Sequence, residues 1–360
     1  MNALTKVNLA NDGPAWAAAI KAQALALGFQ QCGITDLNLA VAEQRFAHWL
    51  ESGAHGEMAF MAAHGSKRTR PDQLVPGTLR VICVRMDYLP ESAQHAQAQL
   101  DNPDAAYVSR YALGRDYHKL MRRRLQKLAD QLAEKFGPFG YRVFVDSAPV
   151  LEKPLAEKAG LGWIGKHTNL LNSKAGSWFF LGEIYVDLPL PIDLPASEHC
   201  GSCTRCISAC PTGAIIAPYR LDARLCISYL TIELKGSIPT PLRALLGNRI
   251  YGGDDCQLVC PWNKFAQLTG EPDFHARHQL DTASLLELFA WDEATFLQKT
   301  EGSASRRIGY ERWLRNLAVA LGNAPRSELA WQALSARSLD ASELVREHVA
   351  WAKARHALAP

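Results

Sequence analysis

The chain has 360 residues, of which 48% are hydrophobic and 21% charged, a balance typical of a folded globular protein rather than a disordered one. This length allows two or three domains with sizeable cores. The formal net charge of +3 permits nucleic-acid binding through a local patch but does not require it. The sequence has no run of about 18 uncharged apolar residues, so we expect no membrane-spanning helix.

Helical and strand-like patterns alternate through the first half of the chain. Residues 16–27 have the pattern of an amphipathic helix closed by a glycine, which is not the pattern of a signal peptide. Apolar, β-branched runs predict strands at residues 79–85, 141–145 and 178–186. Leucine and methionine recur every three or four positions over residues 121–132, which predicts one buried helix face.

The composition divides the chain into three predicted domains, and the predicted fold is a multi-domain α+β/α protein. Residues 1–190 have the mixed helices and strands of an α/β domain. Residues 191–270 are rich in cysteine, and residues 271–360 have the pattern of an all-helical domain. Helical runs in that last part include residues 313–321 and 345–357.

Seven of the nine cysteines lie between residues 200 and 260. Without an export signal we expect a cytoplasmic protein, in which structural disulfides are rare. The first cysteines follow the pattern Cys200-x2-Cys203-x2-Cys206-x3-Cys210-Pro211. In this ferredoxin pattern three thiolates bind one cubane and the fourth binds another, whereas zinc sites use separated pairs of cysteines. The spacing therefore predicts iron–sulfur clusters.

A second group of cysteines consists of Cys226 and the ending Cys256-x3-Cys260-Pro261. Two ferredoxin-like clusters are therefore predicted. In ferredoxins with two clusters, the last cysteine of each motif binds the cluster of the other motif. By this rule, one cluster is bound by Cys200, Cys203, Cys206 and Cys260, and the other by Cys210, Cys226 and Cys256.

The second cluster lacks one thiolate, because Gly253 stands three residues before Cys256, where the ferredoxin pattern has a cysteine. Three interpretations remain open. One iron has a non-cysteine or solvent ligand, with Asp254 as the protein candidate; the cluster has only three irons; or the cluster is impaired. The two cysteines outside this region, Cys32 and Cys83, lie in apolar surroundings and are interpreted as buried thiols.

Several strings of residues together resemble the epoxyqueuosine reductase family. They are the cysteine motifs, the run from Ile250 to Asn263 with its ending Cys-Pro-Trp-Asn, Asp-Ser-Ala-Pro-Val-Leu-Glu-Lys at 146–153, and Ala-Gly-Leu-Gly-Trp-Ile-Gly-Lys at 159–166. The likeness covers almost the whole chain. It has two departures: the family usually has cysteine at Gly253 and arginine at Lys153, where lysine keeps the charge but loses the planar fork.

The resemblance implies a fold, a reaction and a set of partners. The fold would be a cobalamin-binding α/β domain, a ferredoxin-like domain with two [4Fe-4S] clusters, the second in doubt at Gly253, and a HEAT-like helical domain that contacts tRNA. The reaction would be reduction of epoxyqueuosine at the tRNA wobble position to queuosine. An external donor such as flavodoxin or ferredoxin would supply the electrons, and the protein would be a monomer.

The resemblance also implies the residues of the site. Asp146 would be the proton donor, assisted by Tyr117 through a hydrogen bond. Burial beside an apolar cofactor would raise the pKa of Asp146 and keep it protonated at neutral pH. The implied cobalamin contacts are Arg68, Asp146, Ser147, Lys166, Thr168, Asn169 and Leu170. The glycines at 160, 162 and 165 would allow the backbone to approach a large ligand, with an ordinary tight loop as the alternative. His118 lies in an incomplete cobalamin signature and is interpreted as a surface residue, not as a cobalt ligand.

Two groups of basic residues are candidates for RNA contact. Lys119, Arg123 and Lys127 share one predicted helix face, with Arg122 and Arg124 beside it. The second group is Arg306, Arg307, Arg312 and Arg315, beside Tyr310 and Trp313. Phosphate contacts by such groups make binding sensitive to salt. The alternative is that each group is only a solvated helix face.

Two other functions share part of this pattern. A corrinoid reductive dehalogenase would use the same clusters and cofactor on small organohalides, but such enzymes commonly carry an export signal and have no need of a basic helical tail. A ferredoxin-like electron carrier would need only the cysteine-rich segment, which leaves the first 190 residues without a role.

Overall fold

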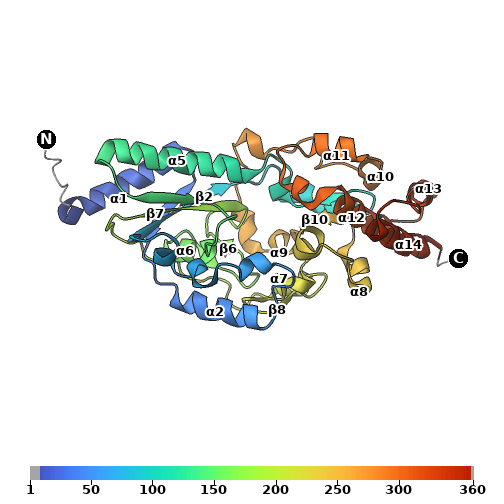
Figure 1. The fold of residues 1–360 in the computed structure, drawn as a ribbon, viewed down its shortest axis with the longest axis horizontal. Coiled ribbons are helices and arrows are strands. Elements are labelled where there is room, and N and C mark those ends of the chain that lie inside the picture. Colours follow the sequence, from blue (N-terminus) through green and yellow to red (C-terminus); the bar gives the residue numbers. More distant parts are fainter. Residues whose placement is uncertain (1–8, 358–360) are drawn as a thin grey trace. The chain divides into compact units, whose positions relative to one another are not determined.

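The computed structural model describes the backbone of residues 9–357 and the side chains of residues 13–357. The chain folds into two compact units, each made of separated segments. Figure 1 labels their helices and strands. The first unit comprises residues 1–52, 60–87 and 117–203, and the second comprises residues 53–59, 88–116 and 204–360. The division into three domains stays a prediction.

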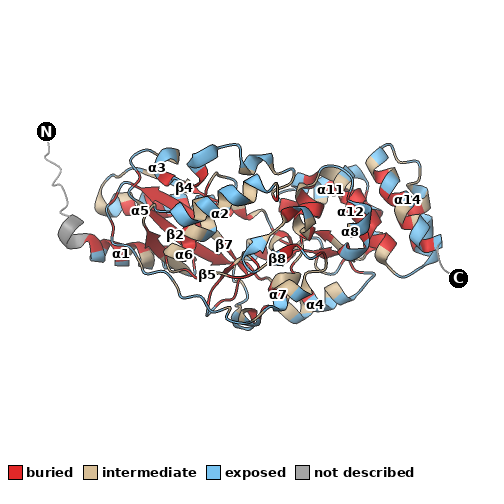
Figure 2. Cartoon of the chain, turned by 90° about the horizontal axis from the view of Figure 1, so that it is seen from below, coloured by how far each residue is buried: buried red, intermediate tan, exposed pale blue. Residues whose placement is uncertain are grey.

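The first unit is built on a four-stranded sheet in the order β1-β2-β7-β4, antiparallel at every pairing. Nearly every residue of β2 and β7 is buried, which explains their continuous apolar runs (Figure 2). Three of the strands confirm the sequence prediction, and β1, which contains Cys32, completes the sheet. The strands are β1 (Gln31–Thr35), β2 (Arg80–Asp87), β4 (Tyr141–Phe144) and β7 (Phe179–Val186).

Helices cover both faces of this sheet. The predicted helix is α5 (Tyr117–Phe136), and its apolar side packs on β7 where Gly182 leaves room, since a Cβ there would lie 2.8 Å from Leu125 Cδ1. Successive strand residues point to opposite faces, so Glu183 faces the other side, which α6 (Glu152–Lys158) covers. The unit also contains α1 (Leu9–Ala26), α2 (Ala40–Glu51), α3 (Pro71–Leu74) and the hairpin strands β5 (Trp163–Ile164) and β6 (Leu170–Leu171).

The core of the second unit surrounds α12 (Gly309–Asn323), in which every residue from 313 to 322 is buried (Figure 2). The predicted helical runs of the C-terminal part are confirmed. This part contains α10 (Leu285–Phe289), α11 (Glu293–Lys299), α12, α13 (Glu328–Ala336) and α14 (Glu343–Ala357). No helix in the described part of the chain has the length and apolarity that crossing a membrane requires.

The rest of the second unit consists of short elements. Strands β3 and β10 pair in parallel, and β8 and β9 form an antiparallel pair. These short elements are α4 (Ala93–Asp101), β3 (Tyr107–Val108), α7 (Arg205–Ala209), β8 (Ile215–Ala217), β9 (Arg220–Leu221), α8 (Thr240–Arg243), β10 (Arg249–Tyr251) and α9 (Asp255–Leu258). The helices and strands of the cysteine-rich segment are therefore all short.

Candidate active site and cluster-binding segment

Asp146 lies just after β4, in the loop that leads to α6. The Tyr117 hydroxyl donates a hydrogen bond to Asp146 Oδ2 at 2.5 Å, and His118 Nε2 lies 3.6 Å from the same oxygen. Tyr117 and His118 come from the first turn of α5. The structure thus brings together Asp146 and Tyr117, the two residues that the sequence suggested for proton transfer, and adds His118, which sequence reasoning had placed on the surface.

Stacking fixes the orientation of the Tyr117 ring. The ring lies 3.8 Å from the Phe180 ring on β7, centroid to centroid, with an interplanar angle of 7°. The His118 ring stacks on it at 4.2 Å. A buried aromatic ring held in this way presents its hydroxyl in one direction. Tyr117 is therefore positioned to orient the Asp146 carboxyl group.

The Asp146 side chain is 55% exposed. The polypeptide alone therefore leaves this carboxyl group accessible, and its burial beside an apolar cofactor stays a prediction. The reason is local: Asp146 and Ser147 lie in an exposed loop beyond the edge of the sheet. Any desolvation of this acid during the reaction would have to come from the groups that bind over it.

Two further carboxyl groups, those of Glu152 and Glu183, lie close to the Asp146 loop. The Asp146 backbone N–H donates to Glu152 Oε1 at 2.8 Å. The Glu152 carboxyl group interacts in turn with Glu183 on β7, which is fully buried and has no hydrogen-bond partner other than Glu152 among the described residues. Repulsion between two carboxylates in contact favours a proton on one of them. This contact was not foreseen; the signal in the sequence was a glutamate inside the apolar run of β7.

The environment of the two glutamates explains why they hold a proton. Burial, and then the charge of Asp146, raises the pKa of Glu152 to about 8. Burial, and then the neighbouring Glu152, raises the pKa of Glu183 well above its ordinary value. Because the two groups titrate together, we assign the retained proton to the pair. The pair is therefore neutralised in part at pH 7 and anchors the backbone of the Asp146 loop.

Two predicted cobalamin contacts lie near Asp146. Arg68 is buried, and its guanidinium group donates to the backbone carbonyls of Phe60 at 2.8 Å and Met61 at 3.2 Å. Burial lowers the pKa of Arg68, and the charge of Asp146 partly opposes this effect. Ser147 is exposed, and its hydroxyl accepts a weak hydrogen bond from Arg122 at 3.4 Å.

Three further predicted contacts belong to the hairpin that joins β5 to β6. Thr168 and Asn169 are partly exposed, and Lys153 Nζ donates to the Thr168 carbonyl at 2.9 Å. The backbone of Thr168 has a φ of 67°, in the left-handed region, which is uncommon for a β-branched residue. Leu170 is buried in the core of the sheet. The hairpin thus offers two accessible polar side chains and one core residue.

Lys166 has a role that the sequence did not indicate. Its ammonium group is largely buried and donates to the carbonyls of Gly201 at 2.6 Å and Cys203 at 3.0 Å. These contacts hold the segment that carries the first two cysteines of the cluster motif. The geometry therefore makes Lys166 a support of that segment.

The glycines at 160, 162 and 165 serve the packing of the protein itself. A Cβ at Gly162 would lie 2.0 Å from the Leu171 carbonyl oxygen, and one at Gly160 would lie 2.6 Å from that of Leu194. A Cβ at Gly165 would lie 2.6 Å from Leu171 Cδ1. The alternative of a tight loop therefore accounts for these glycines, and their approach to a ligand stays a prediction.

Three of the predicted cluster ligands come together in the second unit. Cys210 follows α7, Cys226 follows a short helix at Ala223–Leu225, and Cys256 lies in α9. Burial raises the pKa of Cys226 and, more strongly, of Cys256, and the neighbouring thiols add to this effect. No disulfide links the nine cysteines, all of which lie in the described part of the chain. Buried thiols gathered in this way are typical of a metal site.

The other cysteines also have distinct surroundings. Cys206 and Cys260, in the second unit, are 8% and 9% exposed. Cys200 and Cys203 lie at the end of the last segment of the first unit and are partly exposed. The remaining two cysteines, Cys32 and Cys83, lie on β1 and β2, and burial raises the pKa of Cys32 to about 12. Their interpretation as buried thiols is confirmed for Cys83, while Cys32 is partly exposed.

The two basic groups differ in their surroundings. On α5, Lys119, Arg122, Arg123 and Lys127 are exposed, so this face is available for phosphate contact. Most side chains of the second group bind other parts of the protein. Arg315 is fully buried and donates to the carbonyls of Leu230, Leu234 and Gly236.

The same holds for the neighbours of Arg315. Arg312 donates to the carbonyl oxygens of Ile308 and Ile232, and Arg307 pairs with Glu233. The Trp313 ring is buried rather than available for stacking. The structure therefore removes Arg315 and Trp313 from the predicted RNA-binding patch, while phosphate contact by the exposed Arg306 and Arg307 stays a prediction.

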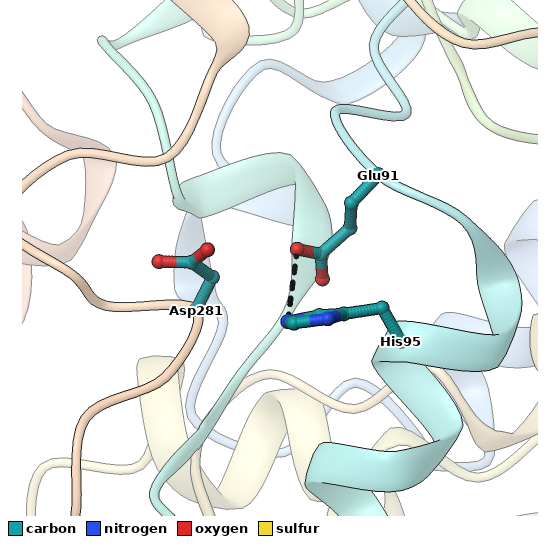
Figure 3. Close-up of side chains that lie close together, drawn as sticks. All are labelled: Glu91, His95 and Asp281. Carbon is teal, nitrogen blue, oxygen red and sulfur yellow. Dashed lines mark ion pairs between the residues drawn. The ribbon is translucent and has the colours of Figure 1, made fainter.

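A further group of side chains has the composition of a metal site. Glu91, His95 and Asp281 have ligand atoms within 4.8 Å of one another, and Glu91 faces His95 with Asp281 opposite (Figure 3). However, Arg110, whose side chain is fully buried, donates to Glu91 Oε1 at 2.8 Å. A fixed guanidinium group at this carboxylate opposes a second cation. The group is therefore explained as an ion-pair network.

Two family models match the chain. Residues 68–147 match "Epoxyqueuosine reductase QueG, DUF1730", and residues 199–263 match "4Fe-4S double cluster binding domain". The first match contains Arg68, Tyr117 and Asp146, and the second contains all seven cysteines of the predicted clusters. The matches therefore coincide with the two sites described above.

Similar proteins and structures extend over nearly the whole chain. The epoxyqueuosine reductase of Pseudomonas aeruginosa is 63% identical over 97% of both chains, and that of Escherichia coli K12 is 60% identical over 93% of this chain and 88% of its own. A crystal structure of epoxyqueuosine reductase with an epoxyqueuosine-modified tRNA-Tyr stem loop has a TM-score of 0.83 at 27% identity, covering 94% of this chain and 89% of that one.

A Bacillus subtilis epoxyqueuosine reductase has a TM-score of 0.84 at 27% identity, covering 94% of this chain and 90% of its own, and is described with its catalytic aspartate loop swung out of the active site. The extent and identity of these matches favour a reductase over the dehalogenase and electron-carrier alternatives, and they confirm the multi-domain fold with its iron–sulfur domain. The chain belongs to the epoxyqueuosine reductase family.

Proposed function

We propose that this chain reduces epoxyqueuosine in tRNA to queuosine, the last step of queuosine biosynthesis, with Asp146 as the proton donor. The observation that carries the assignment of the acid is the half-exposed Asp146 carboxyl group, oriented by the Tyr117 hydroxyl at 2.5 Å. Family membership supports the reaction. The relative crystallised with a modified tRNA stem loop supports tRNA as the substrate.

The reaction requires electrons and protons from different parts of the chain. Removing an epoxide oxygen as water consumes two electrons and two protons, while iron–sulfur clusters deliver electrons one at a time. A bound cobalamin supplies a cobalt centre that can accept single electrons and react with carbon. The residues that fit its peripheral amide groups are Ser147, Thr168 and Asn169, because their polar side chains are accessible and belong to the Asp146 loop and the adjoining hairpin.

The cysteines divide between two clusters by the ferredoxin crossing rule. Cys210, Cys226 and Cys256 belong to the second cluster, which is supported by their proximity. The first cluster is then bound by Cys200, Cys203, Cys206 and Cys260. An external flavodoxin or ferredoxin supplies the electrons, and the enzyme works as a cytoplasmic monomer.

Within the polypeptide, proton delivery depends on the Asp146 loop. The Asp146 carboxyl group donates a proton to the departing oxygen. Tyr117 keeps this carboxyl group oriented, and Glu152 holds the backbone of the loop through the Asp146 N–H. The exposed basic face of α5 provides phosphate contacts for tRNA. The wobble nucleoside leaves its stack to reach the site, as base-modifying enzymes require.

The test of this function is the substitution Asp146→Ala in protein reconstituted without oxygen. We expect turnover of epoxyqueuosine-containing tRNA to be abolished, as measured by nucleoside mass spectrometry, while iron content and cobalamin uptake stay unchanged. The control is Asp130→Ala, which removes an exposed carboxylate on α5 that bonds only to Gln126 and Tyr141 in the described structure. Loss of cobalamin binding in Asp146→Ala would assign this residue a structural role instead.

A further inference from the structure

Gly253 is close in sequence to Cys256, one of the three gathered thiols. It lies three residues before Cys256, where a ferredoxin motif has its remaining ligand. A Cβ at Gly253 would lie 3.3 Å from both Cβ and Cγ2 of Ile227, the residue after Cys226. The position therefore faces the segment that carries another cluster ligand. The residue itself is partly exposed, so solvent reaches this place.

Asp254 does not replace the missing thiolate. Its side chain is buried, and its carboxylate accepts hydrogen bonds from Tyr107 Oη at 2.9 Å, Ser109 Oγ at 2.6 Å and the Arg110 N–H at 2.9 Å. Turning this carboxylate to an iron would leave three buried donors without their acceptor, which is unfavourable. The interpretation of Asp254 as a cluster ligand is therefore wrong.

Asp255 is engaged in the same way. One of its oxygens lies 3.7 Å from the position of a Cβ at Gly253, so it is near enough to be considered. However, Arg249 binds both oxygens, with Nε 2.8 Å from Oδ2 and Nη2 paired with Oδ1. Such a two-point ion pair has a preferred planar geometry that coordination of iron would break. Asp255 therefore links α9 to β10 through Arg249 and is not available as a cluster ligand.

We propose that, in this chain, the cluster bound by Cys210, Cys226 and Cys256 has one iron without a protein ligand, and that this iron binds a small exogenous ligand such as water or cyanide. The inference rests on the cysteine assignment made under the proposed function. It selects one of the three interpretations of the sequence: a four-iron cluster with a solvent ligand at the corner facing Gly253. Such a corner is the weakest point of the cluster, because no thiolate holds its iron.

An iron without a thiolate ligand makes this cluster sensitive to oxidation. Ferricyanide removes one electron from a [4Fe-4S]²⁺ cluster and is itself reduced to ferrocyanide. The resulting [4Fe-4S]³⁺ cluster separates into [3Fe-4S]⁺ and Fe²⁺, so that charge and iron balance. The cluster with four cysteines holds every iron through a thiolate and resists this loss. Oxidation of the native protein therefore releases one iron from each chain.

The experiment compares native protein with Gly253→Cys and Gly253→Ala, all reconstituted without oxygen. Cysteine is compatible with this position because Gly253 is not among the glycines with a positive φ. After ferricyanide, native protein and Gly253→Ala should give the electron paramagnetic resonance signal of a three-iron cluster and lose one iron per chain. Gly253→Cys should give neither. Gly253→Ala is the matched control because it adds the same Cβ without sulfur.

A second measurement needs no variant. Cyanide added to dithionite-reduced native protein should shift the resonance of one cluster, and Fe²⁺ added to oxidised, re-reduced protein should restore the four-iron signal. If native protein forms no three-iron cluster and does not respond to cyanide, the proposal is wrong. A three-iron signal lost equally in Gly253→Ala would also overturn it. Neither result depends on tRNA, so reduction of epoxyqueuosine tests the proposed function separately.

Discussion

At the scale of single residues, Tyr117 is the side chain whose role follows most directly from geometry. Its hydroxyl donates to Asp146 Oδ2 at 2.5 Å, and its ring is fixed by stacking on Phe180. A hydrogen bond to a charged group is worth about 1.5–3 kcal/mol. We therefore expect Tyr117→Phe to lower kcat by about tenfold to a hundredfold, with little change in KM, since the substitution removes orientation rather than binding.

The control for this substitution is Tyr141→Phe. The Tyr141 hydroxyl also donates to an aspartate, Asp130 at 2.6 Å, but on the exposed side of α5. Steady-state kinetics with epoxyqueuosine-containing stem loops should show native kcat for Tyr141→Phe. An unchanged kcat in Tyr117→Phe would mean that Asp146 is oriented by other contacts, of which His118 is the nearest.

Sequence reasoning found the residues of the site that lie in distinctive strings and missed those that reach it through folding. Asp146 was found because it opens a specific string after a predicted strand. His118 was missed because its proximity to Asp146 depends on how α5 packs on β7. The Glu152–Glu183 contact joins two elements of the sheet region and has no local signal beyond a charged residue in a buried strand.

At the scale of elements, the basic face of α5 is the RNA contact that the structure leaves accessible. Replacing Lys119, Arg123 and Lys127 with alanine removes three exposed charges from one helix face. If each contacts a phosphate, the slope of log affinity against log salt should become shallower by roughly 2–3. Fluorescence anisotropy with a labelled anticodon stem loop at several salt concentrations measures this slope.

The matched control is the double substitution Arg306→Ala and Arg307→Ala. It removes two exposed arginines from the group that the sequence suggested as a second patch. Because Arg307 pairs with Glu233 and Arg306 donates to the Leu297 carbonyl at 2.5 Å, these charges are already used within the protein. We expect a native salt slope for this variant. A loss equal to that of the α5 variant would restore the second patch.

The two basic groups show what a sequence pattern cannot decide. Both have arginines or lysines at helical spacing, and both occur beside aromatic residues. On α5 the charges lie on the side opposite the apolar stripe, so the helical period already predicts exposure. Arg315 lies on the apolar side of α12, where its guanidinium group binds carbonyls of residues more than 75 positions away. Only the tertiary structure supplies those acceptors.

The Glu152–Glu183 contact makes the first unit sensitive to pH. The folded pKa of each group is raised above its ordinary value of 4.5, to about 8 for Glu152, so the folded state binds more protons than the unfolded state. The free energy of unfolding is then highest below pH 4.5 and falls as pH rises toward 8. The slope is about 1.4 kcal/mol per pH unit for each extra proton.

Substituting Glu183→Gln should flatten this dependence, because the amide stays neutral and cannot be ionised in the core. Thermal unfolding at pH 5.5 and pH 8.5 provides the comparison, with the exposed Glu134→Gln on α5 as control. We expect native protein and the control to lose stability between these values and Glu183→Gln to lose less. An equal loss in all three proteins would show that the pair does not retain a proton.

At the scale of the whole molecule, the two units depend on metal to different degrees. The first unit has a sheet with buried strands and helices on both faces, so its core is complete without a ligand. The second unit has a core around α12, but its cysteine-rich segment consists of short helices and strands that carry the predicted cluster ligands. A segment of this kind gains stability mainly from the ligands that it binds.

Removing iron should therefore loosen one part of the chain and leave the other intact. We expect chelation to raise hydrogen exchange across residues 204–265, where Cys210, Cys226 and Cys256 lie, while the strands β2 and β7 keep their protection. The unfolding midpoint should fall by about 5 °C or more, since the clusters bind only the folded state. Cys226→Ser should reproduce the effect, and Cys32→Ser should not, because Cys32 lies in the sheet. Uniform loss of protection would show that the sheet also requires the clusters to fold.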